Sequence, residues 1–220
     1  MSLNSELQAF YQARQQQMPA DVRDAVNRAT RELEATGQAG RALSAGDRAP
    51  LFDLPDAKGR TVGLAEALGA GPVVLTFYRG AWCPYCNLAL RALQQIHGEI
   101  TARGARLVAV SPQNPDDSLT LAEKHGLAFD VLTDTGCRIA KLYGLSFDIS
   151  DEQAAVYRRI GLDLVRANSG FDRTLPIPAT FVIAADGTIA WSFTDADYTK
   201  RAEPAEVLAA LAGQVRPPVG

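Results

Sequence analysis

Apolar runs and helical patterns alternate along most of the chain. Three runs have the length and composition of buried strands, and they occupy residues 73–78, 106–111 and 129–132. A helical pattern follows each run, at about residues 84–102, 114–125 and 136–143. An alternation of this kind predicts an α/β fold.

The C-terminal part adds a hairpin and a last helix. Residues 179–183 and 188–193 have strand patterns and flank Asp186-Gly187, a dipeptide typical of hairpin turns. Glu203-Pro204 begins a helix that reaches about Ala212. The complete order predicts a mixed central sheet with helices on both faces.

The N-terminal part is helical in pattern and separate from this alternation. Residues 3–36 carry apolar side chains at helical spacing, and Met18-Pro19-Ala20-Asp21 interrupts them. We expect two amphipathic helices that pack on the rest of the chain or on the partner subunit of a homodimer. The chain then divides into a helical extension with a linker, residues 1–44, and an α/β domain, residues 45–216, with a partly helical insertion at 148–172.

The composition of the chain argues against several classes of function. The net charge is −3, and no basic stretch is dense enough to indicate binding to nucleic acid or to an anionic membrane. No apolar run reaches the roughly 18 residues of a membrane span. The N-terminus lacks the apolar core of a signal peptide, so we expect a cytoplasmic protein, whose thiols are kept mostly reduced.

The candidate chemistry lies at the end of the first predicted strand. After Arg79-Gly80-Ala81 the chain reads Trp82-Cys83-Pro84-Tyr85-Cys86, with Cys83 at the predicted helix start and Pro84 at its first position. A thiol there meets the positive end of the helix dipole, which stabilises its thiolate. Cys86 lies one turn further, close enough to form a disulfide with Cys83. The pattern indicates reversible thiol–disulfide chemistry.

Two other interpretations of the cysteine pair compete with redox chemistry. A zinc site needs a second pair of ligands, and the remaining soft ligands, Cys137, His97 and His125, are not paired at ligand spacing. Buried structural thiols are common, but this interpretation does not explain two cysteines at a strand-to-helix turn. We therefore expect no metal, and we expect Cys137 to be a lone, partly buried thiol.

With this cysteine pair, the order of elements resembles the thioredoxin superfamily. The segment from Phe77 to Cys86 resembles the active-site segment of its peroxiredoxin-like branch, the alkyl hydroperoxide reductase and thiol-specific antioxidant type. Four more segments match that branch in order and spacing: Gly46–Leu54, Leu132–Asp134, Ala140–Gly144 and Ala179–Ile183. The resemblance covers about residues 45–213 and implies a thioredoxin-like fold and an oxidoreductase.

The departures from this branch affect its peroxide-binding residues. A typical peroxiredoxin has a Pro-x-x-x-Thr-x-x-Cys pattern, and here its Cys falls on Cys86, its Thr on Cys83 and its Pro on Arg79. The family's Arg before the Ala-Thr-Phe strand falls on Pro178. Cleavage of a peroxide needs donors for the departing oxygen, so these changes count against efficient peroxide reduction.

Other features resemble thioredoxins. Trp82 precedes the cysteine pair as in thioredoxins, and Ile177-Pro178 occupies the place of their cis-proline, beside which an extended substrate binds. We expect a cis bond at Pro178, with an ordinary trans proline as the alternative. Trp82, Pro84, Tyr85, Ile177 and Pro178 then form the rim of the site.

The sequence leaves the roles of two arginines undecided. Arg79 and Arg173 could lie near the thiols, where a positive charge lowers their pKa or replaces the lost donors. Because arginine is mostly exposed in proteins, a solvated surface position is the competing interpretation, and we favour it for both residues. Arg79, which lies four positions before Cys83, is nevertheless a candidate residue of the site rim.

The resemblance to thioredoxin implies a disulfide reductase. Cys83 attacks an oxidised sulfur, Cys86 resolves the mixed disulfide, and a thioredoxin- or glutathione-type dithiol donor restores both thiols, with no cofactor. One alternative is a thiol peroxidase, in which Cys86 or Cys83 reacts with a hydroperoxide and the other cysteine condenses with the sulfenic acid. A second alternative is a redox-responsive interaction module without turnover.

Overall fold

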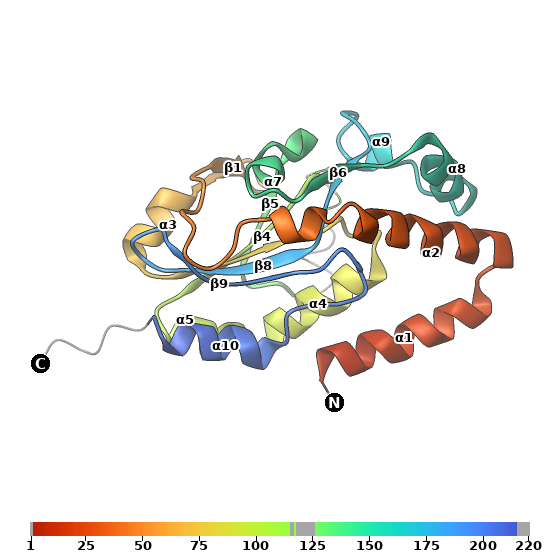
Figure 1. Cartoon of the computed structure of the whole chain (residues 1–220). Helices are drawn as coiled ribbons and strands as arrows, with labels where there is room; N and C mark the ends of the chain where they lie inside the picture. The colour runs from red at the N-terminus through yellow and green to blue at the C-terminus, as the bar shows by residue number, and fades with distance from the viewer. Residues whose placement is uncertain (1, 115–116, 118–125, 215–220) are drawn as a thin grey trace, which may run out of the picture.

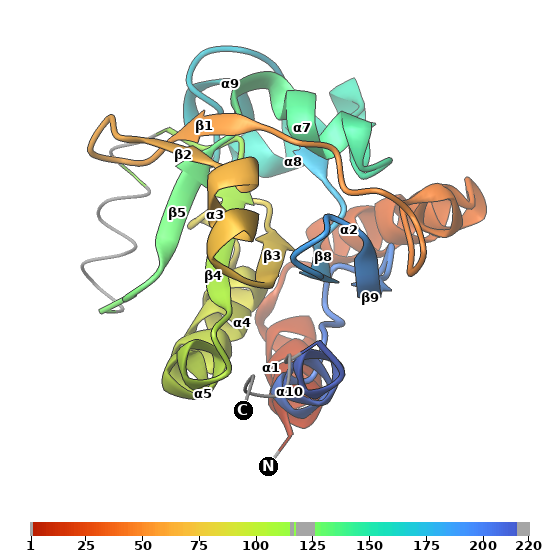
Figure 2. The ribbon, with the colours of Figure 1, turned by 90° about the vertical axis from the view of Figure 1, so that its left-hand side faces the viewer.

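The computed structural model describes residues 2–114, 117 and 126–214. A mixed five-stranded sheet lies at its centre, in the order β5-β4-β3-β8-β9 (Figure 2). Its strands are β3 (Val73–Phe77), β4 (Arg106–Ser111), β5 (Asp130–Thr133), β8 (Ala179–Ile183) and β9 (Ile189–Thr194). β3, β4 and β5 run parallel, whereas β8 runs antiparallel to both β3 and β9. These pairings confirm the predicted mixed sheet and hairpin.

Helices cover both faces of the sheet, as Figures 1 and 2 show. One face carries α4 (Pro84–Gln95), α5 (His97–Ala102) and α10 (Pro204–Ala212). The other carries α3 (Leu64–Ala70), the turn η2 (Thr135–Cys137), α7 (Arg138–Leu142) and the small hairpin of β1 (Asp53–Pro55) and β2 (Thr61–Gly63). The helix predicted over 84–102 divides at Ile96, and the one predicted over 114–125 lies almost entirely outside the described residues.

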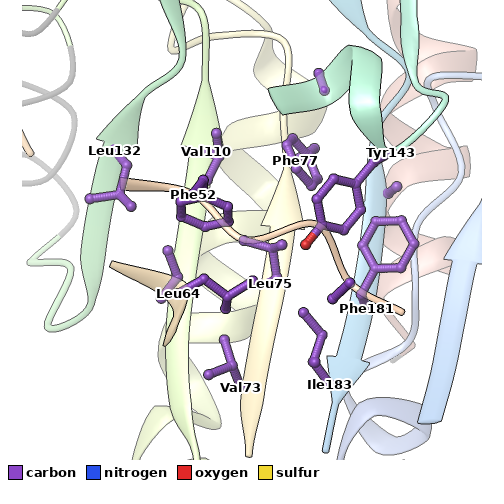
Figure 3. Packing of buried hydrophobic residues seen from close by; sticks show 14 of the residues in the cluster. Phe52, Leu64, Val73, Leu75, Phe77, Val110, Leu132, Tyr143, Phe181 and Ile183 are labelled. Atoms are coloured by element: carbon purple, nitrogen blue, oxygen red, sulfur yellow. The ribbon is translucent and has the colours of Figure 1, made fainter. Parts of the chain in front are cut away.

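Strand β3 separates two hydrophobic clusters. Successive side chains of a strand point to opposite faces, so Leu75 and Phe77 enter the first cluster, with α3, α7 and the small hairpin (Figure 3). Val74 and Tyr78 enter the second cluster, with α4, α5 and α10. Because β3 is buried on both faces, its sequence is a continuous apolar run and not an alternating one.

The two N-terminal helices, α1 (Leu3–Gln17) and α2 (Ala20–Ala35), confirm the predicted pair. α1 buries Leu3 and Leu7 in the second cluster, and the Glu203 carboxylate accepts hydrogen bonds from the first backbone N–H groups of this helix. α2 packs Leu33 against the first cluster and continues to the short η1 turn (Gln38–Arg41). Both helices therefore contact the α/β part of the same chain.

A subdomain lies between β6 (Ser146–Asp148) and β7 (Thr174–Pro176), which pair antiparallel. It contains α8 (Asp151–Arg159) and α9 (Leu164–Ala167). Helices α8 and α2 lie at the same end of the molecule (Figure 1), and two ion pairs connect them, Arg28 with Glu152 and Arg159 with Asp21. In the described part of the chain, no helix is long and apolar enough to cross a membrane.

Candidate active site

The turn after β3 places both cysteines at the start of α4. Cys83 is the N-cap residue and Pro84 the first helical residue, as the sequence predicts. Gly80 has φ 145°, and a Cβ there would lie 2.4 Å from Nε1 of Trp82. The turn therefore requires glycine at this position.

Both thiols are buried between α4 and the segment that precedes α10. Cys83 is 2% exposed and Cys86 is 0% exposed. Nη2 of Arg201 donates a hydrogen bond to Sγ of Cys86 at 3.2 Å. Arg201 is itself only 6% exposed, so a guanidinium and a thiol meet in an environment with little water.

These surroundings favour the thiolate of Cys86. Burial alone raises the pKa of a thiol, but four interactions outweigh it at Cys86. They are the hydrogen bond from the Cys83 thiol, the charge of Arg201, the backbone hydrogen bond from Arg79 and the charge of Arg79. The pKa of Cys86 consequently lies below the usual range of cysteine.

Cys83 has the opposite character. Burial raises its pKa, the hydrogen bond that it shares with Cys86 raises it further, and the charges of Arg79 and Arg201 offset only part of this. The sequence-based expectation that the helix start stabilises the Cys83 thiolate is therefore wrong. The contact of the Arg201 guanidinium with the Cys86 sulfur favours the negative charge of this pair on Cys86.

Arg79 is buried as well, at 4% exposure, so the favoured expectation of a solvated surface residue is wrong. Its guanidinium lies 4.5 Å from the ring centre of Tyr198 and 5.0 Å from that of Trp82, and it donates to the hydroxyl of Tyr157. An aromatic surround of this kind holds a guanidinium through cation–π contact. Its charge acts on both thiols.

Arg201 is the site residue that sequence reasoning missed. Nη1 donates to the carbonyls of Tyr198 and Lys200, and the Arg201 backbone is bound by Asn4 of α1. No motif surrounds this arginine in the sequence, and it lies 115 positions from Cys86. Only the folded chain brings the two together.

The rim residues near the cysteines fall where the sequence places them. Trp82 is half-buried and packs edge-on against Tyr157 of α8 at 5.8 Å between ring centres. Tyr85 is buried between Phe10 of α1 and Tyr198, at 5.2 and 5.3 Å. The N-terminal helix thus contributes directly to the surroundings of the thiols.

Ile177 and Pro178 depart from the prediction. The Ile177–Pro178 bond is trans, so the predicted cis-proline is wrong. The Ile177 N–H donates to the carbonyl of Leu145 at 2.8 Å, and the chain then passes directly from β7 into β8 without a tight turn. The Ile177 side chain packs in the first cluster, whereas both thiols lie in the second.

The remaining candidates lie apart from the thiol pair. Arg173 forms an ion pair with Asp151 at 2.7 Å, on the subdomain between β6 and β7. Cys137 is buried, its Sγ donates to the carbonyl of Thr174, and burial raises its pKa well above the usual range. Neither residue contacts Cys83 or Cys86 in an interaction that the structure records.

Comparison with known proteins assigns this site to a family. The sequence profile of the AhpC/TSA family matches residues 45–192, which include both cysteines. The chain belongs to the AhpC/TSA family. This AhpC/TSA member therefore has the fold class and the branch that its active-site segment resembles, and its family supports an oxidoreductase that works through cysteine thiols.

The relatives of this AhpC/TSA chain include two kinds of thiol enzyme. It is 32% identical over 103 residues to peroxiredoxin Bcp of Escherichia coli, a match that covers 47% of this chain and 65% of the relative. It is 31% identical over 102 residues to the thiol-disulfide oxidoreductase ResA of Halalkalibacterium halodurans, covering 46% and 57%. The chain spans less than two thirds of the length of these curated relatives.

Solved structures show the same fold. The crystal structure of peroxidoxin BcpB from Mycobacterium tuberculosis superposes with a TM-score of 0.61 at 23% identity. The superposition covers 78% of this chain and 97% of that structure. At this identity the likeness supports the thioredoxin-like fold alone.

Proposed function

We propose that this chain is a thiol peroxidase in which Cys86 attacks the hydroperoxide. The contact between Arg201 and the Cys86 sulfur carries the proposal, because it stabilises a thiolate at the position that aligns with the reactive cysteine of peroxiredoxins. Its peroxiredoxin relatives support the same assignment. The main expectation from the sequence, a disulfide reductase with Cys83 as nucleophile, is the second candidate.

The proposed reaction consists of two steps. The Cys86 thiolate attacks the distal peroxide oxygen, the O–O bond breaks, and the alkoxide leaves as an alcohol after taking a proton, which gives a sulfenic acid on Cys86. Cys83 then attacks the Cys86 sulfur and displaces water, which forms the Cys83–Cys86 disulfide. A thioredoxin-type dithiol donor returns two electrons and two protons to restore both thiols.

Arg201 and Arg79 replace the hydrogen-bond donors and the positive charge that the substituted family positions no longer provide. A departing oxygen needs donors close to the reacting sulfur. The Nη2 group of Arg201 is within hydrogen-bond distance of Cys86, and the charge of Arg79 acts on the same sulfur. Because Cys86 is fully buried in this conformation, the peroxide must displace neighbouring side chains to reach it.

The disulfide reductase remains the second candidate because of ResA-type relatives. In that mechanism the attacking thiol needs an exposed sulfur and a lowered pKa. Cys83 has neither, since it is 2% exposed and its pKa is raised. Because Cys86 is buried as well, exposure does not separate the two functions, and the raised pKa of Cys83 beside the lowered pKa of Cys86 is what favours the peroxidase.

A stopped-flow experiment separates the two functions. Fully reduced protein is mixed with hydrogen peroxide, and the fluorescence of Trp82, which lies beside Cys83, reports oxidation. We expect a second-order rate constant far above that of a free thiolate, and slow reduction of a protein disulfide such as that of insulin. A peroxide rate no faster than a free thiol, with rapid insulin reduction, would establish the disulfide reductase instead.

A further inference from the structure

A cavity of about 470 Å³ lies between α2, β6 and α8, next to the thiol site. Its volume falls within the range of sites for drug-sized molecules. Helix α2 contributes Ala25, Val26, Ala29 and Leu33; β6, α8 and their connection contribute Phe147, Ile149 and Val156. The walls are held together by the two ion pairs between α2 and α8. An apolar group therefore fits between α2 and α8.

Arg79 also lines this cavity, together with Pro178 and Tyr198. Its Nε is buried and has no hydrogen-bond partner among the described residues. Within the same part of the chain, the guanidinium forms no ion pair with a carboxylate, and the only hydrogen bond recorded for it goes to the hydroxyl of Tyr157. The charge of the Arg79 guanidinium acts on the Cys86 thiolate without a direct contact between the two groups that the structure records, and a buried charge is costly unless it is closely paired, so this guanidinium favours an anion beside it.

The two carboxylates of the cavity wall have partners of their own. Glu32 lies 4.0 Å from Arg28, and Oδ1 of Asp148 accepts a hydrogen bond from the Thr174 hydroxyl at 2.7 Å. Neither of them pairs with Arg79. The cavity thus combines an apolar wall with one cation whose charge is uncompensated by a carboxylate.

We propose that this cavity binds an amphipathic monocarboxylate, with its apolar tail between α2 and α8 and its carboxylate on Arg79. The site is distinct from the thiol pair, but the two share Arg79. An anion there competes with the Cys86 thiolate for the same positive charge.

A consequence for the thiols rests on the proposed function. When Cys86 and Cys83 form a disulfide, Arg79 loses the negative charge of the thiolate. The carboxylate is then its remaining counter-charge, so the ligand binds the disulfide form more tightly than the reduced form. By linkage, the bound ligand stabilises the disulfide by the same factor.

Calorimetric titration of the whole chain with octanoate tests the site. Octanol has a tail of the same length without the charge, and it is the matched control ligand. We expect octanoate to bind the reduced protein at least about tenfold more tightly than octanol, since a hydrogen bond to a charged group is worth this much or more. Equal affinity for the two ligands, or no binding of either, would overturn the proposal.

Two variants test the location. Ala29→Phe fills the cavity from α2 and should abolish octanoate binding, whereas Ala35→Phe, on an exposed position of the same helix, should leave it unchanged. Arg79→Met should remove the preference for octanoate over octanol. Unchanged binding in both Ala29→Phe and Arg79→Met would place the ligand elsewhere and contradict the proposal.

The redox linkage has its own measurement. Protein oxidised with diamide should bind octanoate about fivefold or more tightly than reduced protein, a coupling of ordinary size. Equal affinity for the two forms would refute the linkage. The titration of reduced protein involves no peroxide. Its result therefore tests the binding site even if the protein proves not to be a peroxidase.

Discussion

Asn4 in the N-terminal helix binds the backbone of Arg201 through two hydrogen bonds. Its Nδ2 donates to the Arg201 carbonyl at 2.7 Å, and its Oδ1 accepts from the Arg201 N–H at 3.0 Å. Arg201 in turn donates to Sγ of Cys86. Helix α1, which lies outside the region matched by the family profile, therefore helps to position the arginine that contacts the reactive sulfur.

Replacement of Asn4 by alanine should affect both stability and the thiol. Asn4→Ala removes the two hydrogen bonds to Arg201 and a third, from Nδ2 of Asn4 to the Glu203 carboxylate at 2.8 Å. At about 1 kcal/mol each, their loss lowers the free energy of unfolding by about 3 kcal/mol. The less fixed guanidinium should raise the pKa of Cys86 and lower the peroxide rate by about fivefold. Denaturant unfolding and stopped-flow rates at several pH values measure these effects.

The control for this variant is Gln8→Ala, an exposed position of the same helix. Gln8→Ala should change neither the free energy of unfolding nor the peroxide rate. If Asn4→Ala loses stability but keeps the peroxide rate and the pKa of Cys86, then Asn4 only attaches α1 and does not position Arg201.

Substitution of Arg201 itself should lower the peroxide rate more than Asn4→Ala does. Arg201→Met removes the donor at 3.2 Å from the Cys86 sulfur, so the peroxide rate should fall by about a hundredfold, as for the loss of one donor to a developing oxyanion. Arg201→Lys keeps the charge without the planar fork and should give an intermediate rate. A peroxide rate in Arg201→Met equal to that of the unchanged protein would exclude Arg201 from the chemistry.

The reactivity of Cys86 should persist at low pH. Its pKa is lowered from the ordinary 9.0 by the hydrogen bond from Cys83 and by the two arginines, against the opposing effect of burial. In Cys83→Ser, whose hydroxyl can still donate, the alkylation rate of Cys86 by iodoacetamide should show its inflection well below pH 9.0. An inflection at or above that value would contradict the charge assignment.

The same shift affects stability. Because the folded-state pKa of Cys86 is lower than that of the unfolded chain, the thiolate stabilises the folded state. This contribution is complete above about pH 9.0 and is lost as the pH falls through the lowered pKa. The difference in unfolding free energy between reduced protein and Cys86→Ser should therefore grow with pH across this interval. A difference independent of pH would argue against the shift.

Gly80 should tolerate no side chain. Its φ is 145°, and Nε1 of Trp82 lies 2.4 Å from the position that a Cβ would occupy. Gly80→Ala should therefore lower the free energy of unfolding by about 1–3 kcal/mol and displace Trp82. Gly98→Ala in α5, where a Cβ meets no atom within 4 Å, should be neutral or stabilising. Thermal unfolding of the two variants provides the comparison, and equal melting temperatures would contradict this account of the turn.

Local patterns predict the fold and the position of the cysteines well. The apolar run at 73–78 and the Cys83-Pro84 start of α4 depend on neighbouring residues, so the sequence contains their cause. The charge on the thiols depends instead on Arg201, which only the packing of the segment before α10 against α4 brings to Cys86.

The burial of Arg79 and the isomer at Pro178 also depend on residues that are distant in the sequence. Arg79 is buried because aromatic rings from three separate segments surround it, and no local pattern contains that information. The trans bond at Pro178 lies in the connection from β7 to β8, where the Ile177 N–H binds the carbonyl of Leu145, a residue 32 positions earlier in the chain. Resemblance to thioredoxin suggested the wrong isomer for that reason.

The central claim is that Cys86, and not Cys83, reacts with the peroxide. Reduced Cys83→Ser and Cys86→Ser proteins, treated with one equivalent of hydrogen peroxide and the sulfenic-acid reagent dimedone, test it by mass spectrometry. We predict a dimedone adduct on Cys86 in Cys83→Ser and none on Cys83 in Cys86→Ser. An adduct on Cys83 in Cys86→Ser, with Cys86 unmodified in the other variant, would contradict the account.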